Sequence, residues 1–165
     1  ELQLIENDIT LATLEPLLAA LSGKPNLRSI DLSRNAIGDV EVSRIIKFLR
    51  SNPHITKLIA ELPIFDGRFG EGTSYDFTYS DAIIDDLVLL IAARNKLFNL
   101  TLPMVFLTQE QQDCIVTALR TNQRLLCLEI CKWEESGDIR AQCNINRANM
   151  FIRKTRLVDL LLEKV

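Results

Sequence analysis

The stretch Leu27-Arg-Ser-Ile30-Asp-Leu32-Ser-Arg-Asn35 decides the fold of this chain. Ile30 and Leu32 are separated by one polar residue, an alternation that is typical of a short strand with one buried face. An asparagine follows at a fixed distance. Because the same pattern returns several times along the sequence, the chain is interpreted first as a series of repeats.

Copies of this stretch are spaced by 28, 28, 42 and 28 residues. The apolar positions of the other copies are Leu2 and Leu4; Ile55 and Leu58; Leu97, Leu100 and Leu102; and Leu125, Leu128 and Ile130. A fixed period of this size is typical of stacked repeats, each of which buries its apolar face against the next. The longer spacing contains 14 additional residues, which fall within 61–81.

Between successive strands lies an apolar stripe with the spacing of one helix face. The stripes are Leu14, Leu17, Leu18 and Leu21; Val42, Ile45, Ile46 and Leu49; Ile84, Leu87, Val88 and Ile91; and Ile115, Val116 and Leu119. Gln112 interrupts the last stripe, and Thr108 with Gln111 has the pattern of a capping box. Asn52 and Asn122 stand where helices are expected to end. The sequence therefore predicts an α/β protein with a parallel sheet.

The pattern L-x-x-L-x-L-x-x-N resembles that of leucine-rich repeats, and the 28-residue unit resembles their ribonuclease-inhibitor-like subclass, which also occurs in effectors of intracellular bacteria. The resemblance covers residues 1–132, about five strand turns, and implies a solenoid with a curved parallel sheet on its concave side and helices on its convex side. The asparagine that bonds buried backbone groups in this family is present at Asn7 and Asn35. Other residues occupy its place in the later turns: Pro63, Val105 and Trp133. We expect those turns to satisfy their backbone differently.

Residues 133–165 leave the repeat period. Asp138 can cap a helix that begins at Ile139. An apolar face is formed by Ile145, Phe151, Ile152, Leu157, Leu160 and Leu161. We expect a helical C-terminal cap over the last repeat, because the end of a repeat array exposes its core. The alternative is a helix that binds a partner. Because the chain starts inside a repeat, further repeats before Glu1 are also considered.

Composition excludes several classes of function. The formal net charge of −3 does not fit a general nucleic-acid binder. No apolar run approaches the roughly 18 residues of a membrane span. With one histidine and no CxxC pair among four cysteines, we expect no metal site, no cofactor and free thiols. The expected location is intracellular, in the cytoplasm, or in the host cytoplasm for a secreted effector.

The outward positions of the strands form the candidate binding surface, because strand side chains alternate. They contain no nucleophile–base pair, so we expect a protein-binding module and not an enzyme. Ile59, Pro103 and Met104 are the expected apolar anchors. The candidate contacts are Asp31, Ser33, Arg34, Lys57, Ile59, Glu61, Thr101, Met104, Glu129 and Lys132. A merely solvated face is the alternative.

The insertion at 61–81 is the second candidate. Five of the ten aromatic residues lie in it: Phe65, Phe69, Tyr75, Phe77 and Tyr79. Aromatic residues on inserted loops favour binding. The contacts assigned to this loop are Phe65, Arg68, Phe69 and Tyr75. Tyr79 aligns with Ile9, Ile37 and Leu107 of other units, so we expect it in the core. The alternative is that the aromatic residues fold back over the repeats.

Three functional hypotheses follow. The first is a non-catalytic module that grips another protein with its strand face and the 61–81 loop, and for which the family resemblance implies inhibition of a partner enzyme as one mode. The second rests on Ile64-Phe65-Asp66-Gly67-Arg68, which resembles the segment carrying the key Gly-Arg of Ran GTPase-activating proteins. That resemblance implies an activator in which Arg68 stabilises phosphoryl charge. The third is a structural spacer between other domains.

Overall fold

The computed structural model describes residues 1–61, 78–93, 96–122, 124–131 and 137–146, with Met104 and Cys131 described by their backbone alone. The elements are β1 (Leu2–Gln3), α1 (Leu11–Leu21), β2 (Ser29–Asp31), α2 (Asp39–Ser51), β3 (Lys57–Ile59), α3 (Asp81–Ala92), β4 (Asn99–Val105), α4 (Gln109–Thr121) and β5 (Cys127–Cys131). A further helix covers residues 137–146. The predicted α/β class is confirmed.

The five strands form one parallel sheet in the order β1-β2-β3-β4-β5. Leu2 pairs with Ile30, Ile30 with Leu58, Leu58 with Leu100, and Leu100 with Leu128. These are the apolar positions that recur along the sequence, so the predicted copies lie in register. The 14 additional residues of the third unit do not shift the pairing of β3 with β4.

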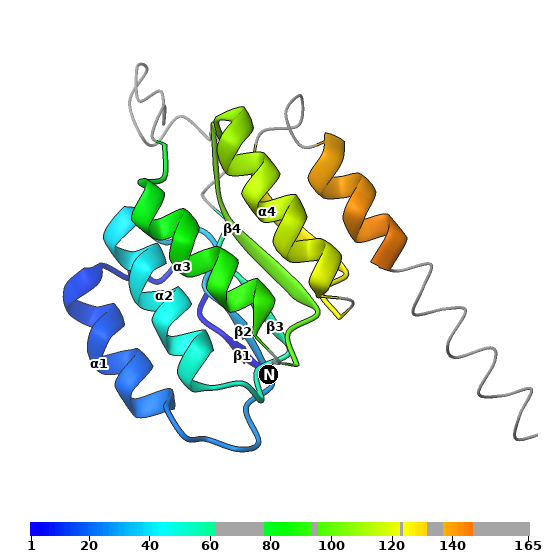
Figure 1. Ribbon diagram of the computed structural model, residues 1–165. Helices are drawn as coiled ribbons and strands as arrows, with labels where there is room; N and C mark the ends of the chain where they lie inside the picture. Colours follow the sequence, from blue (N-terminus) through cyan, green and yellow to red (C-terminus); the bar gives the residue numbers. More distant parts are fainter. Residues whose placement is uncertain (62–77, 94–95, 123, 132–136, 147–165) are drawn as a thin grey trace, which may run out of the picture.

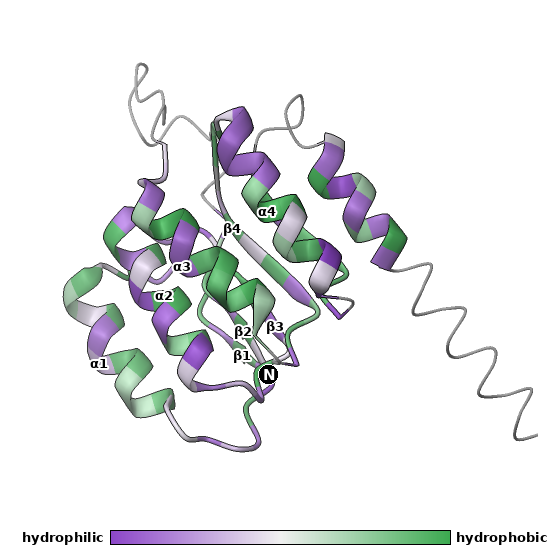
Figure 2. Ribbon diagram, viewed as in Figure 1, coloured by the Kyte–Doolittle hydropathy of each residue, from purple (hydrophilic) through white to green (hydrophobic). Residues whose placement is uncertain are grey.

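All the labelled helices cover the same face of the sheet. Figure 1 shows α1 to α4 side by side, with helix 137–146 beside α4. Hydrophilic residues are frequent on the sides of α2 and α4 that face the viewer, away from the sheet (Figure 2). None of the helices in the described ranges is long and apolar enough to cross a membrane. The other face of the sheet carries no described helix. We call it the open face, and its residues are Gln3, Ser29, Asp31, Lys57, Ile59, Asn99, Thr101, Cys127 and Glu129.

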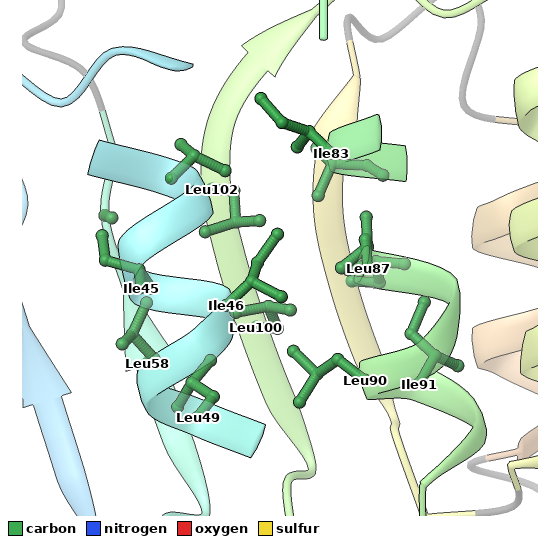
Figure 3. Close-up of a cluster of buried hydrophobic side chains, with 14 of the residues drawn as sticks. Ile45, Ile46, Leu49, Leu58, Ile83, Leu87, Leu90, Ile91, Leu100 and Leu102 are labelled. Atoms are coloured by element: carbon green, nitrogen blue, oxygen red, sulfur yellow. The ribbon is translucent and has the colours of Figure 1, made fainter. Parts of the chain in front are cut away.

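The core lies between the sheet and the helices. The predicted stripe of α2 is buried in it, and so is that of α3 except for Val88, which is partly buried. Figure 3 shows side chains of α2 and α3 meeting those of β3 and β4; they are Ile45, Ile46, Leu49, Leu58, Ile83, Leu87, Leu90, Ile91, Leu100 and Leu102. Full burial of each such side chain stabilises the fold by about 1.5–3 kcal/mol. Gln112, which interrupts the fourth stripe, is buried as well, and its Nε2 donates to the carbonyl of Leu107 at 3.2 Å.

Asn35 joins the first two turns. Its side chain is 1% exposed, and its Oδ1 accepts hydrogen bonds from the backbone N–H groups of Asn7 and Ile9, both at 2.9 Å. Its Nδ2 donates to the carbonyls of Leu4 at 2.7 Å and Leu32 at 2.8 Å. The predicted role of Asn35 is confirmed. Asn7, at the same place in the first described turn, is exposed and its Nδ2 donates to the carbonyl of Ile5, so for Asn7 the bridging role stays a prediction.

Tyr79 bonds the backbone of the turn in which Val105 holds the asparagine position. Tyr79 is 1% exposed, as expected for a core residue, and its hydroxyl donates to the carbonyl of Pro103 at 2.6 Å. Val105, at the asparagine position, is buried and pairs with Cys131 after an irregularity that begins at Thr101. The expectation of a different backbone arrangement is confirmed at this turn.

Three buried asparagines connect successive turns: Asn52 and Asn122 at helix C-caps, and Asn146 in helix 137–146. Asn52 Oδ1 accepts from the N–H of Gly23 at 3.0 Å, and Asn122 Nδ2 donates to the carbonyl of Ile91. Asn146, in helix 137–146, does the same. Its Nδ2 donates to the carbonyls of Asn122 at 2.7 Å and of Leu125 at 3.1 Å. Side-chain hydrogen bonds therefore connect successive helices, as backbone hydrogen bonds connect the strands.

Helix 137–146 packs its face formed by Ile139, Cys143 and Asn146 onto the last turn; these residues are 1%, 3% and 1% exposed. The prediction that Ile145 belongs to this face is wrong, because Ile145 is 51% exposed. In a helix of 3.6 residues per turn, positions 139, 143 and 146 share one side and position 145 points away. The helix also includes Asp138, so it does not begin at Ile139 as predicted. The rest of the predicted cap, residues 147–165, lies outside the described residues.

Candidate functional site

The sheet arranges the open-face residues in two rows that run across the strands. The first row is Ser29, Lys57, Asn99 and Cys127, and the second is Gln3, Asp31, Ile59, Thr101 and Glu129. Neighbouring strands lie about 4.8 Å apart. Residues that are 28 or 42 positions apart in the sequence thus become direct neighbours, and the open face brings together predicted contacts from four turns.

The second row places an apolar side chain between two carboxylates. Asp31 and Ile59 are half-buried, and Glu129 is exposed. The Oδ1 of Asp31 accepts from the N–H of Ser33 at 3.0 Å. The hydroxyl of Thr101 donates to Glu129 Oε2 at 3.3 Å, so the Glu129 carboxylate lies toward β4. Each carboxylate therefore accepts a hydrogen bond that orients it.

Two predicted contacts are not accessible. Ser33 is 8% exposed and Thr101 is 4% exposed, so the prediction that they contact a partner directly is wrong. Thr101 has a short side chain between the longer Ile59 and Glu129 of the neighbouring strands. Ser33 is likewise the short residue at the end of its strand. Pro103, expected to be an anchor, is also buried, and it lies where the pairing of β4 with β5 is irregular.

The first row holds polar atoms beside Lys57. Ser29 Oγ and Asn99 Oδ1 are buried and make no hydrogen bond within the described residues. They flank Lys57, which is half-buried, from the two neighbouring strands. Ser29 and Asn99 were not among the predicted contacts. Their outward strand positions signalled them, but small neutral side chains give no chemical signal in a sequence.

Three charged and exposed residues, Glu6, Arg34 and Glu61, border the open face, and we call them its rim. Arg34 has a φ of 59° and an ion pair with Glu6, with Nη1 and Oε2 3.5 Å apart. Its N–H donates to the carbonyl of Glu61 at 2.7 Å. Arg34 and Glu61 are both exposed, as a contact surface requires.

The structure describes no side chain for six of the predicted contacts. Five lie outside the described residues: Phe65, Arg68, Phe69, Tyr75 and Lys132. Met104 lies in β4, where only its backbone is described. These residues stay predictions from the sequence.

The chemistry that the open face offers is hydrogen bonding, charge and apolar contact. In the described ranges, no group of three or more His, Cys, Asp or Glu side chains is placed to hold a metal ion. Cys114, Cys127 and Cys143 are free thiols. The sequence matches no model of a known protein family and no curated protein. A function has therefore to be inferred from the geometry of the open face.

Proposed function

We propose that the chain is a leucine-rich repeat solenoid whose open face is a concave surface that binds a partner protein. Three observations support this: strands that pair at a 28-residue period, helices on the opposite face, and Asn35 bridging two turns. In repeats of this kind the strands take less width than the helices, so the array curves toward the strands.

The second row of the open face carries the proposal. Asp31, Ile59 and Glu129 come from three different turns and offer charge and apolar surface at one place. Interfaces combine such apolar centres with polar surroundings. A stable contact buries about 800 Å² per partner, which requires several adjacent turns. The loop at 61–81 is proposed to add contacts through Phe65, Arg68, Phe69 and Tyr75. When the bound region of the partner is an active site, binding inhibits the enzyme.

The proposal is tested by affinity purification of a partner with the full chain, followed by crosslink mapping and two matched substitutions. Ile59→Asp places a charge on the open face, and Leu89→Asp places the same charge on α3, where Leu89 is 53% exposed. We expect partner binding to be lost with Ile59→Asp and kept with Leu89→Asp, with circular dichroism showing both folded. Crosslinks that avoid both the open face and residues 61–81 would overturn the proposal.

A GTPase-activating role for Arg68 is the second candidate, supported by the Gly67-Arg68 motif in the insertion. It predicts that the chain accelerates GTP turnover by a small GTPase and that Arg68→Ala abolishes the acceleration. Partner binding that survives Arg68→Ala and fails with Ile59→Asp favours the binding module instead.

A further inference from the structure

We propose that the open face recognises a basic helical segment, in which two cationic side chains flank one apolar side chain. The segment lies across the second row, with its apolar side chain on Ile59 and its cations on Asp31 and Glu129. This inference rests on the proposed function and specifies the chemistry of the partner.

The charge of the described open face and its rim supports a basic occupant. Glu6 and Arg34 form an ion pair and neutralise each other. The remaining charges of the described face and rim are the three carboxylates of Asp31, Glu61 and Glu129 and the one ammonium group of Lys57. An excess of carboxylates on one face attracts cationic partners and orients them before contact.

The spacing along the second row supports a helical occupant. Asp31, Ile59 and Thr101 lie on consecutive strands, in steps of about 4.8 Å. Glu129 stands one strand beyond Thr101, and its Oε2 lies 3.3 Å from the Thr101 hydroxyl, so its carboxylate is between two and three strand spacings from Asp31, about 10–14 Å, with Ile59 between them. A helix rises about 1.5 Å per residue, so positions i, i+4 and i+7 lie on one side and span about 10.5 Å. The helix span of about 10.5 Å falls at the lower end of that range.

The experiment uses the full chain labelled with ¹⁵N and titrated with synthetic peptides, each an alanine-rich helix of about 17 residues. The matched peptide has lysine at i and i+7 and leucine at i+4. A second peptide has the same composition with both lysines moved to the opposite helix face, and a third has glutamate in place of lysine. We expect the matched peptide to shift the amide signals of β2 to β5 and to bind about threefold or more tightly than the second peptide, because exposed charge pairs contribute modestly. Added salt weakens the binding.

Two variants neutralise the proposed contacts, Asp31→Asn and Glu129→Gln. Each is expected to weaken the matched peptide by about two- to fivefold. The control variants Asp85→Asn on α3 and Glu110→Gln on α4 remove the same charges from exposed helix positions. They are expected to bind as the unsubstituted chain does.

The outcomes separate this inference from the proposed function. If all three peptides shift the strand signals equally, the face binds without selecting charge, and the inference is overturned while the proposed function stands. The inference also fails if no peptide shifts those signals, or if the control variants lose as much affinity as Asp31→Asn and Glu129→Gln. Partner purification with Ile59→Asp then tests the proposed function separately.

Discussion

Asn35 Oδ1 accepts a hydrogen bond from the backbone N–H of Asn7, 2.9 Å away, although the two asparagines hold the same place in successive turns. The residues before them, Arg34 and Glu6, both have a φ of 59°. The two turns therefore share one backbone shape. Only Asn35 has a described turn before it that it can bond. Substitutions of Asn35 and Asn7 therefore compare the same side chain with and without these bonds between turns.

Asn35→Ala is expected to lower the free energy of unfolding by about 2–6 kcal/mol, because two backbone N–H groups lose their acceptor at about 1–3 kcal/mol each. Asn7→Ala is expected to cost less than about 0.5 kcal/mol, because its side chain is exposed. Urea denaturation measures both values. Equal losses for the two variants would contradict the bridging role of Asn35.

Tyr79→Phe removes the hydrogen bond to the carbonyl of Pro103 and is expected to cost about 1 kcal/mol at pH 8. Burial raises the pKa of the Tyr79 hydroxyl, and the nearby charge of Asp39 raises it further. Because the folded-state pKa is above the unfolded one, the unsubstituted chain loses stability as pH rises above the ordinary tyrosine value of about 10. Tyr79→Phe lacks this loss. Urea midpoints at pH 8 and pH 11 should therefore converge or cross; a constant difference would contradict the prediction.

Asp39→Asn tests whether the half-buried carboxylate at the start of α2 destabilises the fold. Burial raises the pKa of the Asp39 carboxyl, and the charge of Glu41 adds to the effect. The Oδ1 of Asp39 is buried and has no hydrogen-bond partner in the described part of the chain. A raised folded-state pKa means that the ionised carboxylate costs stability above that pKa, and that the cost disappears below the unfolded value of about 3.9.

The stability of Asp39→Asn relative to the unsubstituted chain should consequently rise as pH increases from 3 to 7. Chemical denaturation across that range measures the difference. A relative stability that falls with pH would show that the carboxylate is stabilised in the fold, and would refute the assignment.

Ile139→Ala and Ile145→Ala compare the two sides of helix 137–146. Ile139 is 1% exposed, and its truncation is expected to cost about 2–5 kcal/mol. Ile145 is 51% exposed, and its truncation is expected to cost less than about 1 kcal/mol. Thermal and urea denaturation measure both. The reverse order would restore the assignment of Ile145 to the buried face.

The repeat could be predicted because its apolar residues recur at a fixed period. Ile30, Leu58, Leu100 and Leu128 recur at fixed distances, and the strands pair at those residues. The helix stripes were predictable for the same reason, since burial on one side of a helix imposes a 3.6-residue period.

Features that depend on neighbouring turns were not predictable. The low exposure of Thr101 comes from side chains on β3 and β5. The residues next to Thr101 in the sequence do not indicate this burial. The bond from Tyr79 to Pro103 links residues 24 positions apart, outside the repeat period. Asn146 has a bridging role in a segment where the repeat pattern has ended, so no alignment of the copies points to it.

The extra length of the third unit enters between β3 and α3 and leaves every strand partner in place. Chain length at this point is thus independent of the architecture around it. Lengthening such a connection costs only about 0.6 kcal/mol for each doubling. The connection between β3 and α3 is therefore suited to grafting. A foreign peptide or a reporter domain inserted there should leave the neighbouring repeats unchanged. New binding specificity can then be added without redesigning the scaffold.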